Sequence, residues 1–237
     1  MSPRTRLILL FGLLITMVAC IRLAFWQVSR LRDRRAANAV AMAALAREEV
    51  DLNVAGAAGP YRKVRAAGTY DRAHEVVLRG QAYREQPGIV VVTPLRLEGR
   101  QHAVLVVRGF VPTPDAVSAN LDSLEERGRV VVQGTTLPLV ARDDRGAPLQ
   151  RAGRTTWKNL DLALREQVPW PILDVVIVQA PDASLPAFPR RIAPPALNDG
   201  PHLSYAIQWF AFAIIAVVGG GILLRHKISH QAPGSSA

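Results

Sequence analysis

Two apolar runs, one near each end of the chain, constrain this protein more than any other feature of its sequence. Leu7 to Ile21 contains no charged residue, and the run extends to Phe25 if Arg22 places its guanidinium at a membrane interface. Leu203 to Leu224 is a second run, of 22 residues. A helix needs about 20 mostly apolar residues to cross a bilayer, because each backbone N–H must find its partner inside the helix there. We therefore predict two transmembrane helices, at residues 7–25 and 203–224.

The first run also has features of a signal peptide, since it is short and follows two arginines. However, Met17-Val18-Ala19-Cys20 matches a lipoprotein cleavage box poorly, and the apolar run continues past Cys20. Trp26 follows at the position of an interfacial aromatic anchor. We therefore interpret the run as an uncleaved anchor. The flanking charges do not determine its orientation, because the charge rule is weak for long loops.

Composition limits what the segment between the two runs can be. Residues 26–202 are long enough for one sizeable core and contain all 19 acidic residues of the chain. The net charge of +10 is spread without blocks of basic and aromatic residues, so we expect no nucleic-acid partner. Cys20 is the single cysteine, which excludes an intramolecular disulfide and a zinc site built on several cysteines.

Strand signals dominate this central segment. They occur at Val64–Tyr70, His74–Arg79, Ile89–Leu97, Ala103–Val111, Val130–Thr136 and Ile172–Gln179. Residues 26–49 favour a continuation of the first helix, Leu160–Val168 favours a short helix, and residues 181–201 form a connector with six prolines. The predicted fold is a membrane protein whose two transmembrane helices flank an α+β, mostly antiparallel-β soluble domain, as a sheet or a partly open barrel.

A search for catalytic motifs finds none. The chain has no nucleophile elbow, phosphate-binding glycine loop or H-E-x-x-H zinc motif. The acidic pairs Asp143-Asp144 and Glu125-Glu126 are interpreted as solvated loops, and His74 and His102 as surface or hydrogen-bonded histidines. We therefore expect no enzymatic activity and no catalytic residues.

His202 differs from the other histidines because it begins the second apolar run. Tyr205 and Trp209 follow it at i+3 and i+7, toward the same side of a helix. A neutral imidazole beside flat aromatic rings at a membrane edge can act as an axial ligand to haem iron. Alternatively, all three residues can anchor the helix among lipid headgroups. The residues alone leave both interpretations open.

Four motifs together resemble the surfeit-locus family of cytochrome c oxidase assembly factors, and they occur in the family's order. Phe25-Trp26-Gln27-Val28-Ser29-Arg30 resembles L-G-x-W-Q-x-x-R, and Tyr61–Tyr70, with Gly68 and Tyr70, resembles the family's first strand. Val107-Arg108-Gly109-Phe110-Val111-Pro112 resembles N-R-G-[WF]-[VI]-P, with Val107 where Asn is common. His202 to Phe210 matches H-L-x-Y-A-x-x-W-F, although Gly200-Pro201 replaces the usual Asn-Asn or Asn-Glu before it.

The resemblance implies a protein of the cell membrane. Residues 26–202 would form a domain outside the cytoplasm, and the tails 1–6 and 225–237 would be cytoplasmic. It implies that the protein binds haem a and assists its insertion into the catalytic subunit of a haem-copper oxidase. Haem a synthase is a further possible partner, and membrane lipid would surround the helices. His202 would ligate the haem iron in a pocket shared with Tyr205 and Trp209.

Two questions remain open at the level of sequence. A purely structural chaperone could grip an oxidase subunit through its helices without touching haem, and the small residues Gly219-Gly220-Gly221 would permit close helix approach in either case. Arg108 could contact a haem propionate or form a buried ion pair, and the ion pair is the favoured role. Gly109 is expected where a bulge or close approach excludes a side chain.

Overall fold

The computed structural model describes residues 2–117, 119–121, 124, 126–142, 146–151 and 154–225. Glu125, Asp143, Asp144 and the tail 226–237 lie outside these residues. The chain divides into a helical unit, Met1–Val40 with Leu197–Ala237, and a sheet unit, Ala41–Ala196.

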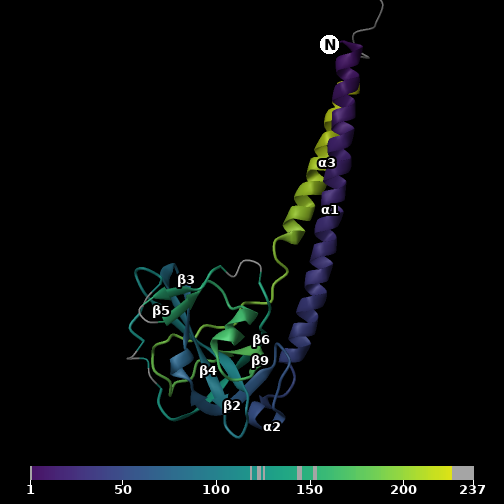
Figure 1. Ribbon diagram of the computed structural model, residues 1–237. Coiled ribbons are helices and arrows are strands. Elements are labelled where there is room, and N and C mark those ends of the chain that lie inside the picture. Colours follow the sequence, from purple (N-terminus) through teal and green to yellow (C-terminus); the bar gives the residue numbers. More distant parts are fainter. Residues whose placement is uncertain are drawn as a thin grey trace, which may run out of the picture. The chain divides into compact units, whose positions relative to one another are not determined.

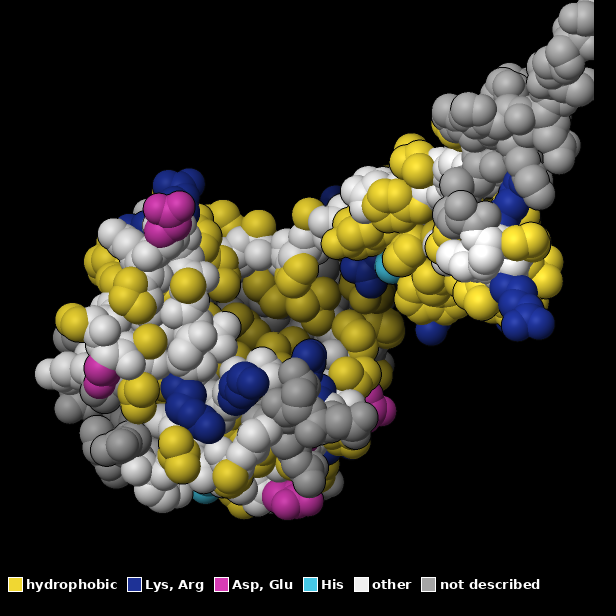
Figure 2. Space-filling view, turned by 90° about the horizontal axis from the view of Figure 1, so that it is seen from above, with side chains coloured by type: hydrophobic (Ala, Val, Ile, Leu, Met, Phe, Trp, Pro, Cys, Tyr) yellow, Lys and Arg dark blue, Asp and Glu magenta, His cyan; other side chains and the backbone are white. Residues whose placement is uncertain are grey.

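The two apolar runs form the long helices α1 (Pro3–Leu45) and α3 (His202–Arg225). α1 continues well past the apolar run because the Ala- and Arg-rich residues after Trp26 have high helix propensity. Both helices are long and apolar enough to cross a membrane. Figure 2 shows that hydrophobic side chains cover much of the surface of the helical unit.

Within the helical unit, α1 and α3 run side by side (Figure 1). Their contacts follow one another in antiparallel order: Gln27 with His202, Phe25 with Phe210, and Leu13 with the position where Gly220 would carry a side chain. The buried residues of α1 recur at alternating steps of four and three, at Cys20, Ala24, Gln27 and Leu31. Such spacing places one stripe of a helix against a neighbour.

The sheet unit is built from nine strands among the described residues. They are β1 (Val50–Asp51), β2 (Lys63–Tyr70), β3 (Val76–Tyr83), β4 (Gln86–Leu97), β5 (Ala103–Pro112), β6 (Arg129–Pro138), β7 (Leu149–Arg151), β8 (Arg154–Trp157) and β9 (Ile172–Gln179). The short helices are α2 (Leu52–Ala55), η1 (Arg72–His74) and η3 (Leu162–Gln167). Pairing is mostly antiparallel, as predicted, with parallel pairs at β1–β2, β3–β8 and β5–β9.

Five strands close into a barrel in the order β2–β6–β9–β5–β4, and β4 pairs back to β2. Closure is possible because β4 is 12 residues long, so that its first part pairs with β3 and its last part with β2. Gly68 lies at the crossing: a Cβ there would be 2.1 Å from the carbonyl oxygen of Arg96. The expected alternative of a partly open barrel is therefore wrong, since the β2–β4 pairing closes the ring.

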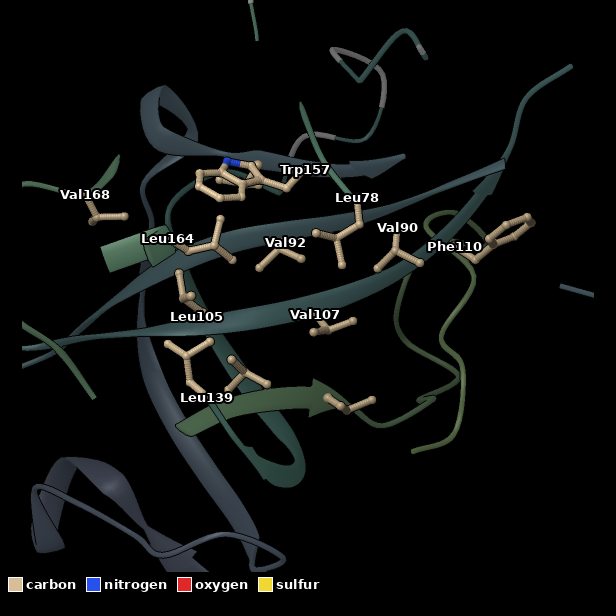
Figure 3. Close-up of a cluster of buried hydrophobic side chains, with 13 residues drawn as sticks. Leu78, Val90, Val92, Leu105, Val107, Phe110, Leu139, Trp157, Leu164 and Val168 are labelled. Atoms are coloured by element: carbon tan, nitrogen blue, oxygen red, sulfur yellow. The ribbon is translucent and has the colours of Figure 1, made fainter. Parts of the chain in front are cut away.

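β5 is buried on both faces, which explains the apolar run Ala103–Val107 at its start. Val104 and Val106 belong to the cluster inside the barrel, whereas Leu105 and Val107 point to a second cluster. Trp157 of β8 and Leu164 of η3 belong to this second cluster, and Figure 3 shows both on one side of the sheet near Val92. Two hydrophobic clusters therefore share the strands β4 and β5.

Several elements differ from the sequence prediction. His74 ends the 3-10 helix η1 instead of beginning a strand, and its ring is hydrogen-bonded to Asp71. The helix predicted at Leu160–Val168 is the 3-10 helix η3, which begins after Asp161, whose side chain accepts from the N–H of Ala163. The strands β1, β7 and β8 were not predicted, because two to four residues are too few for a recognisable alternation.

β5 has an irregularity at Arg108, and this irregularity explains why a glycine is needed at position 109. Val91 pairs with Gly109 and Val92 with Val107, so Arg108 is an extra residue on β5. Gly109 has φ +141°, and a Cβ there would lie 2.3 Å from the carbonyl oxygen of Arg190. Phe110 and Arg190 exchange backbone hydrogen bonds. Gly109 was expected at a bulge or a close approach; the structure has both, and the approaching backbone is that of the proline-rich connector.

We predict that Gly109→Ala lowers the free energy of unfolding by about 1–3 kcal/mol, because the new methyl group displaces the connector backbone. The measurement is urea denaturation of the full chain in detergent, followed by circular dichroism. Gly59→Ala is the matched control, since nothing lies within 4 Å of a Cβ at Gly59, and a change within about 0.5 kcal/mol is expected there. Equal effects at the two positions would contradict this account of Gly109.

Candidate functional site

The residues just before His202 are bonded to α1. The side-chain amide of Asn38 and the guanidinium of Arg34 both donate to the carbonyl oxygen of Asn198, at 3.0 Å and 3.2 Å. Arg35 forms an ion pair with Asp199 at 2.8 Å. These bonds connect residues 198–199 to a helix that is more than 150 residues away in sequence. The start of α3 is therefore held on α1 just before His202.

Gly200-Pro201, the departure from the family motif, has a clear role in this geometry. Gly200 has φ +68°, a left-handed conformation that glycine adopts without the usual steric cost. Pro201 then precedes the first helical residue, and its carbonyl oxygen accepts from the N–H of Tyr205. The sharp turn thus brings His202 to the first position of α3.

His202 is bonded to a glutamine of the other helix. Its Nδ1 lies 2.8 Å from Oε1 of Gln27, whose residue is only 9% exposed. An amide oxygen only accepts hydrogen bonds, so Nδ1 carries the hydrogen in this arrangement. In the neutral imidazole Nε2 is then the nitrogen with the lone pair, and it has no hydrogen-bond partner within the described part of the chain. The first and last motifs of the family resemblance meet in this bond.

This donor set would suit a nitrogen ligand of haem iron. Haem iron takes a neutral imidazole through one ring nitrogen while the other donates to a neighbouring acceptor. His202 supplies the first feature through Nε2 and the second through its bond to Gln27. The residues present are therefore chemically suited to the group that the motifs imply.

The two aromatic residues predicted to share the site lie differently. Trp209 is half-buried and packs edge-on against Phe212, with ring centroids 5.8 Å apart. Tyr205 is 45% exposed. A pocket shared by these two side chains and His202 therefore stays a prediction. The structure instead supplies Gln27 as the neighbour of His202.

Two other residues of the first motif, Trp26 and Arg30, face outward. Trp26 is 51% exposed, and the guanidinium of Arg30 lies over its ring at 5.6 Å. A stacked cation–aromatic pair of this kind suits a membrane–water interface. Neighbouring residues of one motif therefore have separate roles: Gln27 contacts α3, while Trp26 and Arg30 contact the surroundings.

A hydrocarbon-lined groove of about 410 Å³ lies farther along the two helices. It is lined by Met17, Ile21, Phe25, Phe210, Ala213, Ile214, Val217 and Val218. Its surface has no polar atoms to bind a charged or hydrogen-bonding group. Such a groove accommodates hydrocarbon, including lipid chains.

In the sheet unit, Arg108 is the centre of a buried charge network. Its guanidinium contacts the carboxylates of Glu75 at 3.1 Å and Glu126 at 2.9 Å, and its side chain is 1% exposed. Arg191 of the connector contacts the same oxygen of Glu126 at 2.9 Å. Thr93 also donates to Glu75, at 2.7 Å. Of the two roles considered for Arg108, the structure contains the ion pair.

Glu126 was interpreted from sequence as part of a solvated acidic pair, and that interpretation is wrong. Its side chain is 12% exposed and lies between Arg108 and Arg191. The sequence held no signal for this, because the partners come from β5 and from the connector. Glu75 was missed for the same reason.

Tyr70 adds an aromatic face to this network. The guanidinium of Arg108 lies 5.0 Å from its ring centroid. Burial, reinforced by the carboxylate of Glu126, raises the pKa of the Tyr70 phenol far above its ordinary value. The ring is therefore neutral beside a charged neighbour. Gly68 thus lies where the barrel closes, whereas Tyr70, Arg108 and Gly109 lie where the connector meets the barrel. Pro112 ends β5.

Comparison with known proteins gives a consistent result. The model of the SURF1 family matches residues 14–214. A SURF1-like protein of Rickettsia felis is 27% identical over 226 residues, which cover 91% of this chain and 96% of the relative. SURF1-like proteins of Rickettsia conorii and Monosiga brevicollis are 27% and 26% identical, covering 88% and 92% of this chain and 88% of each relative.

We predict that Arg108→Met lowers the free energy of unfolding by about 3–5 kcal/mol, because it removes the cation that faces the buried carboxylates of Glu75 and Glu126. Arg129→Met is the matched control, since Arg129 pairs with Glu98 while both side chains are more than half exposed. We expect that control to cost less than about 1 kcal/mol. Adding Glu75→Gln to Arg108→Met should restore part of the stability. Equal losses in the two single variants, measured by urea denaturation, would overturn the network account.

Proposed function

The chain belongs to the SURF1 family, and we propose that it is a membrane-anchored assembly factor for a haem-copper oxidase that binds haem a through His202. The four family motifs that the sequence contains support the oxidase role. The observation that carries the haem proposal is the bond from His202 Nδ1 to Gln27 Oε1, at 2.8 Å. That bond leaves Nε2 as the coordinating atom.

The proposed arrangement has α1 and α3 crossing the cell membrane, with the sheet unit outside the cytoplasm. The length and apolar character of both helices support insertion. The stacked pair of Trp26 and Arg30 supports an interface close to the His202 end of α3, because Gln27, the next residue of α1, contacts His202. His202 would then lie where an apolar haem in the bilayer can reach it.

Each residue of the site has a defined task in this proposal. His202 binds the iron, Asn198 and Asp199 fix the start of its helix on α1, and the hydrocarbon-lined groove offers room for an apolar substituent. Bound haem a supplies the redox-active iron that the oxidase subunit is to receive. The chain itself catalyses no reaction in this account and would pass the group to the oxidase catalytic subunit, with haem a synthase as a further partner.

We predict that His202→Ala loses its haem, because the replacement removes the iron ligand while leaving both helices intact. The measurement is the Soret absorbance of the full chain purified from cells that make haem a. His102→Ala is the control, since His102 is exposed and belongs to the sheet unit. Equal haem content in wild type and His202→Ala would favour the alternative of a purely structural chaperone for an oxidase subunit.

The proposed topology has its own test. A reporter that is active only outside the cytoplasm, fused at Asn120 in the sheet unit, should be active. The same reporter fused to the C-terminus at Ala237 should be silent. Activity of a cytoplasmic reporter at Asn120 would show that the orientation is reversed.

A further inference from the structure

We infer that Gln27 is a positioning residue for His202: it fixes the tautomer of the imidazole so that Nε2 is the atom presented to a ligand. The inference rests on the proposed function for the nature of that ligand. The tautomer itself is a property of this chain, and it can be measured without haem.

The contact between Gln27 and His202 determines where the hydrogen of the imidazole lies. Oε1 of Gln27 lies 2.8 Å from Nδ1 of His202, and an amide oxygen has no hydrogen to give. The contact is a hydrogen bond only if Nδ1 is protonated. A free histidine prefers the other tautomer, with hydrogen on Nε2, in which that nitrogen has no lone pair for iron. Gln27 therefore selects the less common tautomer, which is the one able to coordinate through Nε2.

Gln27, the acceptor of this hydrogen bond, is also held rigidly. Gln27 is 9% exposed and belongs to the same buried stripe of α1 as Ala24 and Leu31. Its amide is therefore screened from water that would otherwise compete for the hydrogen bond. Arg35 and Asn38, about two and three helical turns farther along α1, hold the residues just before His202. The imidazole is thus fixed from both its backbone and its ring.

The hydrogen bond from His202 to Gln27 would also affect an iron bound to the imidazole. An acceptor on Nδ1–H makes the imidazole a stronger electron donor, which favours ferric over ferrous iron and lowers the reduction potential. A carboxylate at position 27 would strengthen this effect, and an apolar side chain would remove it. A residue that served only to pack the helices would produce no such order, because glutamate and leucine would disturb packing without opposite effects on the iron.

The first test uses the chain without haem. Nitrogen NMR of the full protein in lipid nanodiscs, labelled with ¹⁵N-histidine, identifies the His202 signals as those that His202→Ala removes. We expect hydrogen on Nδ1 in wild type and on Nε2 in Gln27→Leu. Gln208→Leu is the matched control, since Gln208 is an exposed glutamine of α3, and it should keep the wild-type tautomer. Hydrogen on Nε2 in wild type, or the same tautomer in wild type and Gln27→Leu, would overturn the inference.

The second test uses the haem-loaded chain and separates this inference from the proposed function. We expect Gln27→Leu to weaken haem binding by about 10- to 100-fold, the range for the loss of a hydrogen-bond partner of a metal-bound histidine. The reduction potential should rise from Gln27→Glu through wild type to Gln27→Leu. If His202→Ala loses haem but the potential and affinity do not respond to position 27, the inference fails and the proposed function stands. If His202→Ala keeps its haem, the proposed function fails, and the NMR result decides the tautomer by itself.

Discussion

The sheet unit depends on a buried charge network centred on Arg108. Arg108 reaches the interior as the extra residue of a bulge in β5, and there it joins Glu75, Glu126 and Arg191, which come from three different parts of the chain. Two cations and two anions balance, which matters because an unpaired charge in an apolar interior costs several kcal/mol. The same bulge leaves room at Gly109 for the connector backbone. The residues of the N-R-G-[WF]-[VI]-P-like motif therefore form the contact between the proline-rich connector and the barrel.

In the helical unit, too, buried polar groups are paired. The buried polar residues of α1 are Gln27 and Asn38 among the described residues: Gln27 bonds to His202 of α3, and Asn38 bonds to the backbone of Asn198, just before α3. In an apolar medium such a bond has little competition from water, so it fixes helix register as well as side-chain orientation. The first and last family motifs therefore describe a single contact, although 175 residues separate its two members.

The sequence predicts those parts of the structure that depend on local periodicity. The two long helices and the strands β2, β4, β5, β6 and β9 follow from apolar runs and alternation. Closure of the barrel could not be predicted, because it depends on β4 pairing with both β3 and β2. The partners of Arg108 were missed because each is distant in sequence, and Glu126 in particular resembles a surface residue until Arg191 covers it. At the site, His202 was identifiable from its place at a helix start, whereas its bond to Gln27 required the antiparallel register of α1 and α3.

The central claim is that His202 supplies a nitrogen ligand to iron. Electron spin-echo envelope modulation of the ferric, haem-loaded full chain detects nitrogen nuclei bonded to the iron. The sharpest sample is a variant that keeps only His202 of the five histidines and is labelled with ¹⁵N-histidine. The account predicts ¹⁵N modulation from a coordinated imidazole in that variant. Haem bound to the same variant without ¹⁵N modulation would contradict it.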